Sequence, residues 1–313
     1  MNRTVATMVP SATDLVVGLG AADRIVGISH ECDHPAVAGR PVLTRAALAT
    51  APAPGEAASD PAALDAEVSA ARAADQPLYL TDREALHRLA PGVVVAQDVC
   101  DVCAVTGDQV QCEVPTGTEV VRLGAVDLAG LRADLRAVGT ALGGDGAARA
   151  EAAVAELDAG LAAVRAQVAG RPQPRVLLLE WGDPAFVAGH WVPELLEAAG
   201  GIDVLGATGA ASRRVPWDEV AAADPDVVVF LPCGYHLAPA VAEGEALRRR
   251  PEVARLRAVV EGRVWATDAT RLFSRCTPVA VEAARTLAAI LHPDLGPADP
   301  LAARRLAGPG ARA

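Results

Sequence analysis

The amino-acid sequence predicts an α/β fold in which two lobes are joined by one long helix. Short apolar runs rich in β-branched residues alternate with helical patterns along the chain, and this alternation is typical of βαβ units. A long Ala-rich helical run lies at the middle of the chain, with βα patterns on both sides of it. Hydrophobic residues make up 51% of the 313 residues and charged residues 21%, a composition that supports a large core and argues against disorder.

The first half of the chain contains the pattern for one α/β lobe. Its predicted strands cover residues 4–9, 24–28, 77–80 and 92–96. Its predicted helices cover residues 12–19, 61–73, 83–89 and 128–142. The shortness and β-branched content of the apolar runs favour strands over buried helix segments. Residues 46–60, rich in Pro, Ala and Gly, are expected to form a surface loop.

The mid-chain helix is predicted over residues 146–169, and a second α/β pattern follows it. Gly160 inside this helix lowers its helix propensity by only about 1 kcal/mol. The later strands are predicted at residues 175–179, 202–205, 226–231 and 262–266, and the later helices at 193–199, 238–249 and 279–291. The expected organisation is an N-terminal lobe over 1–125, a linker and bridging helix over 126–171, a C-terminal lobe over 172–293 and a loosely ordered tail over 294–313.

Charge and composition exclude several function classes. The formal net charge is −11, and all 28 basic residues are Arg. An acidic chain without a basic block is a poor nucleic-acid binder. The absence of Lys removes Schiff-base chemistry and the phosphate-binding lysine of P-loops. Neither a nucleophile elbow, a Gly-x-Gly-x-x-Gly fingerprint nor a His-Glu-x-x-His motif occurs, so an enzymatic role would rest only on the cysteines and histidines.

The pattern of apolar residues also predicts where the protein resides. No run of about 18 apolar residues occurs, so no membrane insertion is expected. The first residues lack the apolar region of a signal peptide and a lipobox cysteine. The chain as written is therefore expected to be cytoplasmic, where its six cysteines would persist as thiols or metal ligands.

Residues that directly follow the predicted strands are the candidate ligand-binding residues, because parallel sheets bind ligands at the carboxyl ends of their strands. These loops contain five of the nine aromatic residues of the chain (four Trp, two Tyr and three Phe). Polar residues gather in loops by default, but aromatic residues in so aromatic-poor a chain would otherwise be found in the core. The candidates are Ser11, His30, Glu31, Asp98, Trp181, Phe186, His190, Trp191, Tyr235, Phe273 and Arg275.

The cysteines raise the possibility of a metal site. Cys100 and Cys103 have the spacing of zinc ligands, but a strong zinc signature needs a second such pair. Cys32 follows another predicted strand of the same lobe, so the three thiols are expected within a few ångströms of one another; His30 or Cys276 would be further ligands. An incidental thiol pair beside a pocket is the alternative for these cysteines. For His190 the choice is between a metal ligand and a hydrogen-bonded structural residue.

Several segments together resemble a known family. These are residues 9–14 (VPSATD), 24–29 (RIVGIS), 91–96 (PGVVVA), 223–229 (ADPDVVV) and 262–266 (GRVWA). They resemble the substrate-binding proteins with a helical backbone, the class III periplasmic-binding-protein-like family that carries cobalamin, haem and iron–siderophores. The resemblance spans about residues 4–293. Residues 29–33 (SHECD), 97–104 (QDVCDVCA), 180–184 (EWGDP) and 189–193 (GHWVP) are similar to a subfamily labelled cobalamin-binding protein.

The resemblance implies two Rossmann-like lobes bridged by one long α-helix, with a ligand cleft between the lobes. It further implies non-catalytic binding of a corrinoid (cobalamin) or a related metal chelate, by an ABC-transporter-type substrate-binding protein or a cytoplasmic carrier. Trp181, Trp191, Tyr235 and Phe273 are expected to face that cleft, and His190 to offer an axial ligand to cobalt. The expected partners are the small-molecule chelate and an ABC transporter permease, with the protein a monomer. The alternative is a Cys/His metalloprotein or enzyme with zinc or an iron–sulfur cluster on the same fold.

Overall fold

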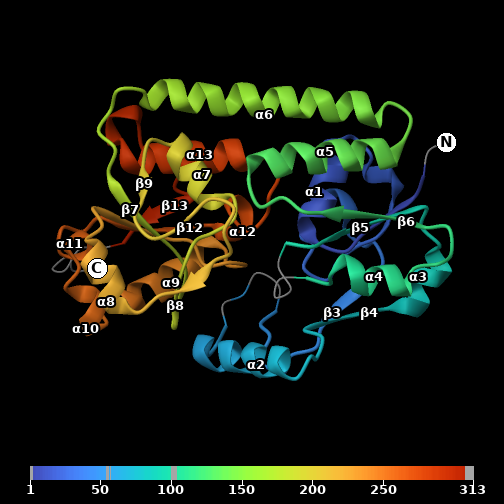
Figure 1. The fold of residues 1–313 in the computed structure, drawn as a ribbon, viewed down its shortest axis with the longest axis horizontal. Helices are drawn as coiled ribbons and strands as arrows, with labels where there is room; N and C mark the ends of the chain where they lie inside the picture. Colours follow the sequence, from blue (N-terminus) through green and yellow to red (C-terminus); the bar gives the residue numbers. More distant parts are fainter. Residues whose placement is uncertain (1–2, 54–55, 57, 100–103, 307–313) are drawn as a thin grey trace. The chain divides into compact units, whose positions relative to one another are not determined.

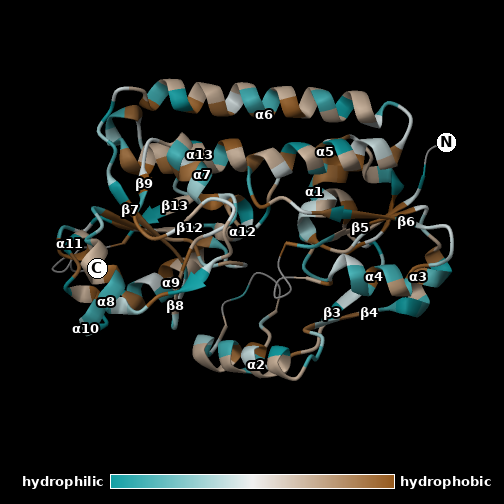
Figure 2. Cartoon of the chain, in the orientation of Figure 1, coloured by the Kyte–Doolittle hydropathy of each residue, from teal (hydrophilic) through white to brown (hydrophobic). Residues whose placement is uncertain are grey.

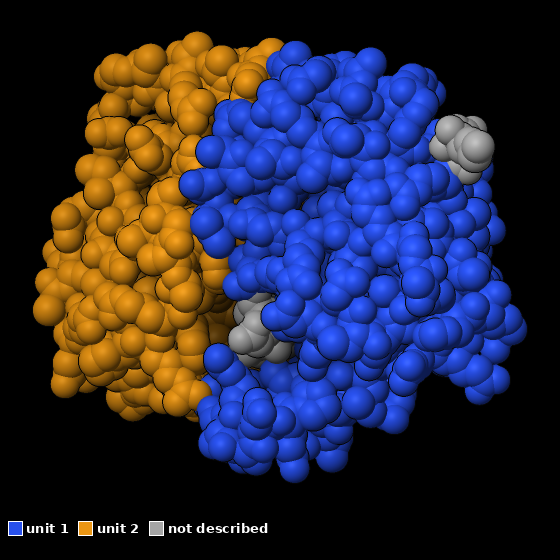
Figure 3. Space-filling model, turned by 45° about the vertical axis from the view of Figure 1, so that its right-hand side comes forward, with its two compact units in different colours: residues 1–54, 58–156 blue, residues 55–57, 157–313 orange. Residues whose placement is uncertain are grey.

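The computed structural model describes residues 3–53, 56, 58–99 and 104–306, and the chain forms two compact units (Figure 3). Unit 1 contains residues 1–54 and 58–156, and unit 2 contains residues 55–57 and 157–313. The division at residues 156 and 157 falls inside one helix, α6 (Gly146–Val168).

Unit 1 is built around a parallel sheet with the strand order β2-β1-β5-β6. The strands are β1 (Val5–Thr7), β2 (Ile25–Gly27), β5 (Val93–Gln97) and β6 (Glu119–Leu123). β5 is buried along its whole length, which explains its uninterrupted apolar sequence. Val5 pairs with Val93, and Val95 pairs with Val121, so the carboxyl ends of the strands meet at one edge. Residues that follow the strands of unit 1 therefore gather at that edge.

Helices cover both faces of the unit 1 sheet (Figure 1). They are α1 (Pro10–Gly18), α3 (Arg83–Leu89), α4 (Gly107–Glu113) and α5 (Leu128–Leu142). α1 and α5 lie on one face, and α3 and α4 lie on the other. Asp82 caps α3 by accepting a hydrogen bond from the Ala85 N–H at 2.8 Å, a common way to start a helix. Met8, Leu43, Leu86 and other buried apolar side chains form the core beneath α3 and α4.

A smaller hairpin-like pair and one helix complete unit 1. β3 (Thr44–Ala46) runs antiparallel to β4 (Tyr79–Thr81), and α2 (Pro61–Ala73) lies between them in the sequence. Asp60 caps α2 through the Ala63 N–H at 3.0 Å, and Pro61 occupies the first turn, where its missing N–H is harmless.

Unit 2 contains a mixed sheet with the order β10-β8-β7-β11-β12-β13, and β9 pairs beside β7. Its strands are β7 (Arg175–Gly182), β8 (Ala185–Val187), β9 (Ile202–Asp203), β10 (Arg213–Arg214), β11 (Val227–Phe230), β12 (Val264–Thr267) and β13 (Ala303–Arg305). β7, β9, β11 and β12 are parallel, whereas β8, β10 and β13 pair antiparallel with their neighbours. Figure 2 shows the central strands as hydrophobic, whereas the helices carry both hydrophobic and hydrophilic residues.

Helices also cover the unit 2 sheet. They are α7 (Val192–Ala198), α8 (Trp217–Ala223), α9 (Leu237–Leu247), α10 (Pro251–Ala254), α11 (Arg257–Val260), α12 (Ala269–Leu272) and α13 (Ala280–Leu291). α13 packs against α7, and α9 packs against β7, β12 and β13 (Figure 1). The core between α9 and the sheet includes Leu177, Phe230 and Tyr235, with Trp181 packed at its margin.

Each half of α6 packs within its own unit. In unit 1, the Arg149 guanidinium donates to the Leu19 and Gly20 carbonyls, and Arg136 on α5 pairs with Glu151. In unit 2, Gly160 lies directly against Val281 of α13. The predicted helix over 146–169 is thus observed, and the remaining predicted helices also occur within two residues of their expected bounds.

Two sequence expectations need correction. The tail over 294–313 is not loosely ordered throughout, because β13 pairs with β12 and Leu306 is only 3% exposed. The turn-rich stretch over residues 296–302, before β13, contains Pro297, Asp299 and Pro300, which disguised the strand. β6, at the edge of the unit 1 sheet, was also missed, because its sequence Glu119–Leu123 mixes charged and apolar residues as an edge strand does.

Candidate functional site

The carboxyl edge of the unit 1 sheet carries a set of hydroxyl groups around His30. The Thr7 and Thr13 hydroxyls are 2.7 Å apart, and the Cys32 thiol donates to Thr13 at 3.4 Å. Ser11 lies beside them in the first turn of α1 and is partly exposed. The adjacency follows from the parallel pairing of β1 with β2, whose following loops carry these residues.

His30 is held from two sides. Its Nδ1 lies 2.7 Å from the Thr44 hydroxyl, which also accepts a hydrogen bond from the His30 N–H at 3.0 Å. Its ring lies 5.7 Å from the Tyr79 ring, centroid to centroid, with an interplanar angle of 47°. Burial lowers the pKa of His30, so the imidazole is neutral at pH 7. A neutral, oriented imidazole is suited to accepting a proton or to binding a metal.

Asp98 is engaged in local structure. Its carboxylate accepts a hydrogen bond from the Gly107 N–H at 2.8 Å, where α4 begins, and pairs with Arg122 at 3.2 Å. Arg122 also binds Asp108 at 2.7 Å. These contacts give Asp98 a structural role at the start of α4. Its expected contact with a ligand stays a prediction.

The expected thiol cluster falls partly outside the described residues. Cys32 is partly buried, and no group of three or more His, Cys, Asp or Glu side chains among the described residues has the arrangement of a metal site. Cys100 and Cys103 lie outside the described residues, so their expected proximity to Cys32 stays a prediction. Cys276, the further candidate ligand, is 9% exposed and follows α12 in unit 2.

In unit 2, Trp181 lies near the carboxyl end of β7. It is the last residue but one of that strand, just before the tight connection to β8, and is partly exposed. Its indole N–H donates to the Asp183 carbonyl at 3.1 Å. Its ring meets the Tyr235 ring edge-on, with centroids 5.7 Å apart and an interplanar angle of 75°. This geometry is one that aromatic pairs prefer.

His190 and Trp191 occupy a constrained connection between β8 and α7. His190 has a φ of +51°, a conformation that side chains other than glycine seldom adopt. Its N–H donates to the Ala210 carbonyl at 2.6 Å, and its carbonyl accepts from Gly209 at 2.9 Å. Burial lowers the pKa of His190 as it does that of His30. The imidazole and the Trp191 ring lie 5.9 Å apart.

Trp191 has a second unusual property. Its ring is partly exposed, but its indole N–H is buried and finds no hydrogen-bond partner among the described residues. Strained backbone and unsatisfied buried donors are both more common at functional sites than elsewhere. Together they single out the Gly189–Trp191 segment as a candidate site.

Phe186 and Arg275 lie on separate parts of unit 2. The Arg214 guanidinium lies 5.4 Å from the centre of the Phe186 ring, because β8 and β10 pair these two residues directly. Arg275 is partly buried in the loop after α12. Glu31, in unit 1, is partly exposed next to His30, and its N–H donates to the Ser29 hydroxyl at 3.3 Å.

Tyr235 and Phe273 differ from the other aromatic candidates in burial. Tyr235 is 2% exposed and belongs to the unit 2 core, and Phe273 is 3% exposed. Their position after strand ends did not distinguish a surface ring from a ring that closes the core. Tyr235 lies beneath Trp181 and supports it.

One pair at the same edge was not among the candidates from sequence. His236 Nδ1 lies 3.3 Å from the Asp268 carboxylate, which also caps α12 through the Arg271 N–H at 2.9 Å. The sequence signal was available, because His236 follows β11 and Asp268 follows β12, and these two strands are parallel neighbours. A carboxylate that binds one imidazole nitrogen fixes the orientation of the ring.

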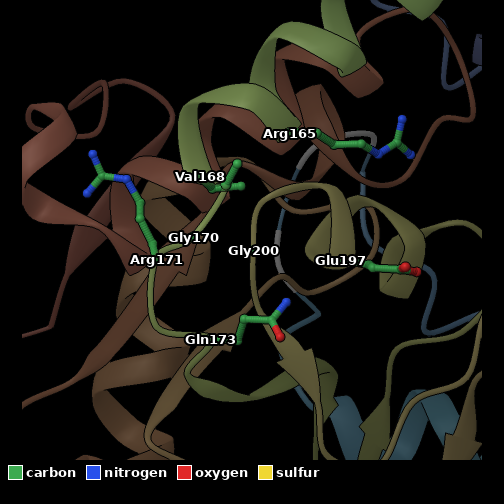
Figure 4. Close-up of a pocket in the computed structure, with 8 residues that line it drawn as sticks. Arg165, Val168, Gly170, Arg171, Gln173, Glu197 and Gly200 are labelled. Atoms are coloured by element: carbon green, nitrogen blue, oxygen red, sulfur yellow. The ribbon is translucent and has the colours of Figure 1, made fainter.

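A surface pocket of about 410 Å³ lies elsewhere in unit 2, where α6 ends (Figure 4). Arg165, Gln173 and Glu197 line it together with the backbone around Gly170 and Gly200. Arg171, which also lines it, pairs with Asp294. None of the predicted site residues lines this pocket. Among the helices that the structure describes, none has the length and apolar character needed to cross a membrane.

Comparisons with solved structures identify the fold. An ABC transporter substrate-binding protein from Listeria monocytogenes matches with a TM-score of 0.68 and 16% identity over 94% of this chain and 100% of that chain. The vitamin B12-binding protein BtuF of Vibrio cholerae matches with a TM-score of 0.64 and 17% identity over 93% of this chain and 97% of that chain. A haem-binding protein from Pseudomonas aeruginosa matches with a TM-score of 0.66 and 23% identity over 96% of each chain.

At these identities the likeness establishes the two-lobed α/β fold, as the sequence predicted. A search of curated protein sequences found no match. The family model described as periplasmic binding protein matches residues 5–270, which is most of the chain. That family consists of proteins that bind solutes without transforming them, in agreement with the expectation that this protein is not an enzyme. The chain therefore belongs to the periplasmic binding protein family.

Proposed function

We propose that the chain binds a planar metal chelate, a corrinoid such as cobalamin, and releases it unchanged. The observation that carries this proposal is the constrained Gly189–Trp191 segment, which holds a neutral imidazole and a partly exposed indole after β8. Flat aromatic rings cover the apolar face of a macrocycle, and the imidazole is a suitable donor to its metal. Trp181, at the end of the neighbouring strand β7, would add a second aromatic contact.

The remaining candidates would contact the polar fringe of such a ligand. Phe186 carries the Arg214 guanidinium over its ring, and Arg275 is a second cation in the same unit. Arginine forks bind carboxylate and amide oxygens with defined geometry. We extend the proposal to Ser11, His30 and Glu31, which follow the strands of the unit 1 sheet in the same way.

The comparisons support the ligand class and suggest a partner. Two proteins with the same fold bind vitamin B12 and haem, and a third is the substrate-binding protein of an ABC transporter. We infer that this chain delivers its chelate to an ABC transporter permease as a monomer. The family is named for the periplasm, and the cytoplasmic location expected from the sequence stays a prediction.

Titration with three chelates tests the proposal. The purified chain is mixed with cyanocobalamin, haemin or a ferric hydroxamate siderophore, and binding is followed by tryptophan fluorescence and by calorimetry. We expect saturable binding of one cyanocobalamin per chain. Saturable binding of haemin alone would replace the corrinoid with a porphyrin, and no saturable binding of any of the three would overturn the proposal. The metal content of the chain purified without chelate tests the alternative, because a zinc or iron–sulfur protein would already contain its metal.

A further inference from the structure

Three side chains of unit 2 form a continuous series from Trp181 through the buried Tyr235 to Glu243. The partly exposed Trp181 ring meets the Tyr235 ring edge-on, at 5.7 Å between centroids. Tyr235 is 2% exposed, so its ring is fixed by the core. Its hydroxyl donates a hydrogen bond to the carboxylate of Glu243 on α9. The Tyr235 hydroxyl thus links the Trp181–Tyr235 ring pair to α9.

Glu243 is well placed for this role, because it lies under the turn that carries Trp181. A Cβ atom added at Gly182 would lie 3.5 Å from Glu243 Oε1 and 3.2 Å from the Leu247 side chain, so the turn lies directly against α9. The indole N–H of Trp181 donates to Asp183 in the same turn. Glu243 and Tyr235 therefore support the ring from below, and Asp183 holds its edge.

The carboxylates near Glu243 are accompanied by one cation, the Arg250 guanidinium. Asp183 is the other carboxylate near Glu243, and it pairs with Arg250 at 3.0 Å. Arg250 also binds Glu252 at 2.6 Å. Burial raises the pKa of Glu243, whereas the hydrogen bond from Tyr235 acts in the opposite direction. An acceptor at this half-buried position, in spite of its partial desolvation, points to a specific use of the hydrogen bond.

We propose that Tyr235 and Glu243 are positioning residues for Trp181, and that they set chelate affinity by fixing the angle of its indole ring. The second part rests on the proposed function, in which Trp181 contacts the chelate. Neither Tyr235 nor Glu243 touches the ligand in this scheme. Both act through the Trp181 ring alone, and this distinguishes them from residues that merely stabilise unit 2.

The first test needs no ligand. Fluorescence of Trp181 is obtained as the difference between each variant and the same variant carrying Trp181→Phe. We expect Tyr235→Phe and Glu243→Leu to increase acrylamide quenching of this difference signal, because the ring gains freedom. Glu243→Gln keeps an acceptor oxygen and should restore the wild-type value. Glu245→Gln, which removes a carboxylate on the same helix that pairs with Arg248, is the matched control and should have no effect. Unchanged quenching in Tyr235→Phe and Glu243→Leu would overturn the positioning role.

The second test is a double-mutant cycle on affinity, with cyanocobalamin and haemin as probes. Tyr235→Phe should weaken binding about fivefold in the wild-type background and have no effect in the Trp181→Phe background, since coupled residues depart from additivity. Equal losses in both backgrounds would show a general structural effect and overturn the inference. If neither probe binds the wild type, the proposed function fails and the effect on affinity falls with it. The ligand-free quenching still decides whether Tyr235 and Glu243 position the ring.

Discussion

His190 holds a left-handed backbone conformation that costs a residue other than glycine about 1–3 kcal/mol. Two backbone hydrogen bonds to the 209–210 turn offset this cost. The preceding residue must be glycine, because a Cβ atom at position 189 would lie 2.4 Å from the Ala210 carbonyl oxygen. The segment therefore requires both the glycine at position 189 and the close approach of the 209–210 backbone. Trp191 follows it directly, at the start of α7.

Replacing Trp191 tests the site at this scale. Trp191→Ala should weaken chelate binding by about 1–3 kcal/mol, the loss that follows removal of a desolvated aromatic contact. Its buried N–H has no partner among the described residues, so the substitution breaks no side-chain hydrogen bond there. Calorimetric titration with cyanocobalamin measures the change, and a thermal scan confirms that the fold is intact. Trp217→Phe, at the start of α8, is the control. Unchanged affinity in Trp191→Ala would show that this ring does not contact the chelate.

At the scale of single elements, α6 shows how packing overrides helix propensity. A Cβ atom at Gly160 would lie 2.7 Å from Val281 Cγ1 and 2.8 Å from its Cγ2. Glycine in the interior of a helix lowers its propensity by about 1 kcal/mol relative to alanine. The glycine is retained because α13 approaches α6 too closely for a methyl group.

Gly160→Ala should therefore destabilise unit 2, even though it improves the helix propensity. Overpacking costs about 1–3 kcal/mol, which exceeds the gain in propensity over most of that range. The same change made in a Val281→Ala background should instead stabilise by about 1 kcal/mol, because the space has been vacated. Urea unfolding of the four proteins measures both signs. Stabilisation by Gly160→Ala in the wild-type background would show that the helices can separate at no cost.

The tail is the second element whose packing can be measured. Leu306 is 3% exposed, belongs to the unit 2 core and donates its N–H to Val264 at 2.9 Å. Leu306→Ala should lower the free energy of unfolding by about 2–5 kcal/mol, the range for a buried leucine. Leu301→Ala is the matched control, since Leu301 is 72% exposed and its loss should change stability by less than about 0.5 kcal/mol. Equal effects would mean that β13 is not docked.

Acid sensitivity is a property of the whole molecule. Burial lowers the pKa values of His30, His190 and His292 below the ordinary histidine value of about 6.5. As the pH falls below that value, the unfolded chain takes up protons before the folded one, so stability present at higher pH is lost. Burial raises the pKa values of Asp134, Asp203 and Glu243, and these carboxyl groups act in the opposite direction as the pH falls towards about 4.

His292 allows the contribution of a single buried histidine to the pH dependence of stability to be measured. It is 5% exposed, and its Nε2 is buried without a hydrogen-bond partner among the described residues, so protonation there is unfavourable. His292→Gln should lose less stability than the wild type between pH 7.5 and pH 5, because it has no imidazole to protonate. Urea unfolding at the two pH values measures the difference. Parallel pH profiles for the two proteins would show that His292 does not contribute.

Local patterns in the sequence were sufficient for the longer helices and the central strands of each unit. The β-branched run at Val93–Gln97 and the amphipathic run at Leu128–Leu142 each carry their periodicity within one element, so no knowledge of neighbours is needed. The position of candidate residues after strand ends is also a local property: His30 follows β2 as expected, whereas β7 extends through Trp181.

Contacts between distant segments were decided only by the tertiary structure. The pairing of β13 with β12 joins residues some forty positions apart, and a short polar strand has no periodicity that reveals such a partner. The left-handed backbone of His190 depends on the 209–210 turn, and the engagement of Asp98 depends on Arg122. Tyr235 and Trp181 both follow strand ends in the sequence, but only the packing of α9 against the sheet made one a core residue and left the other partly exposed. The sequence by itself thus determined the main helices and strands, and the strand ends near which the candidate residues lie. Long-range packing determined which of the candidate side chains are exposed, because exposure depends on neighbours that local patterns do not specify.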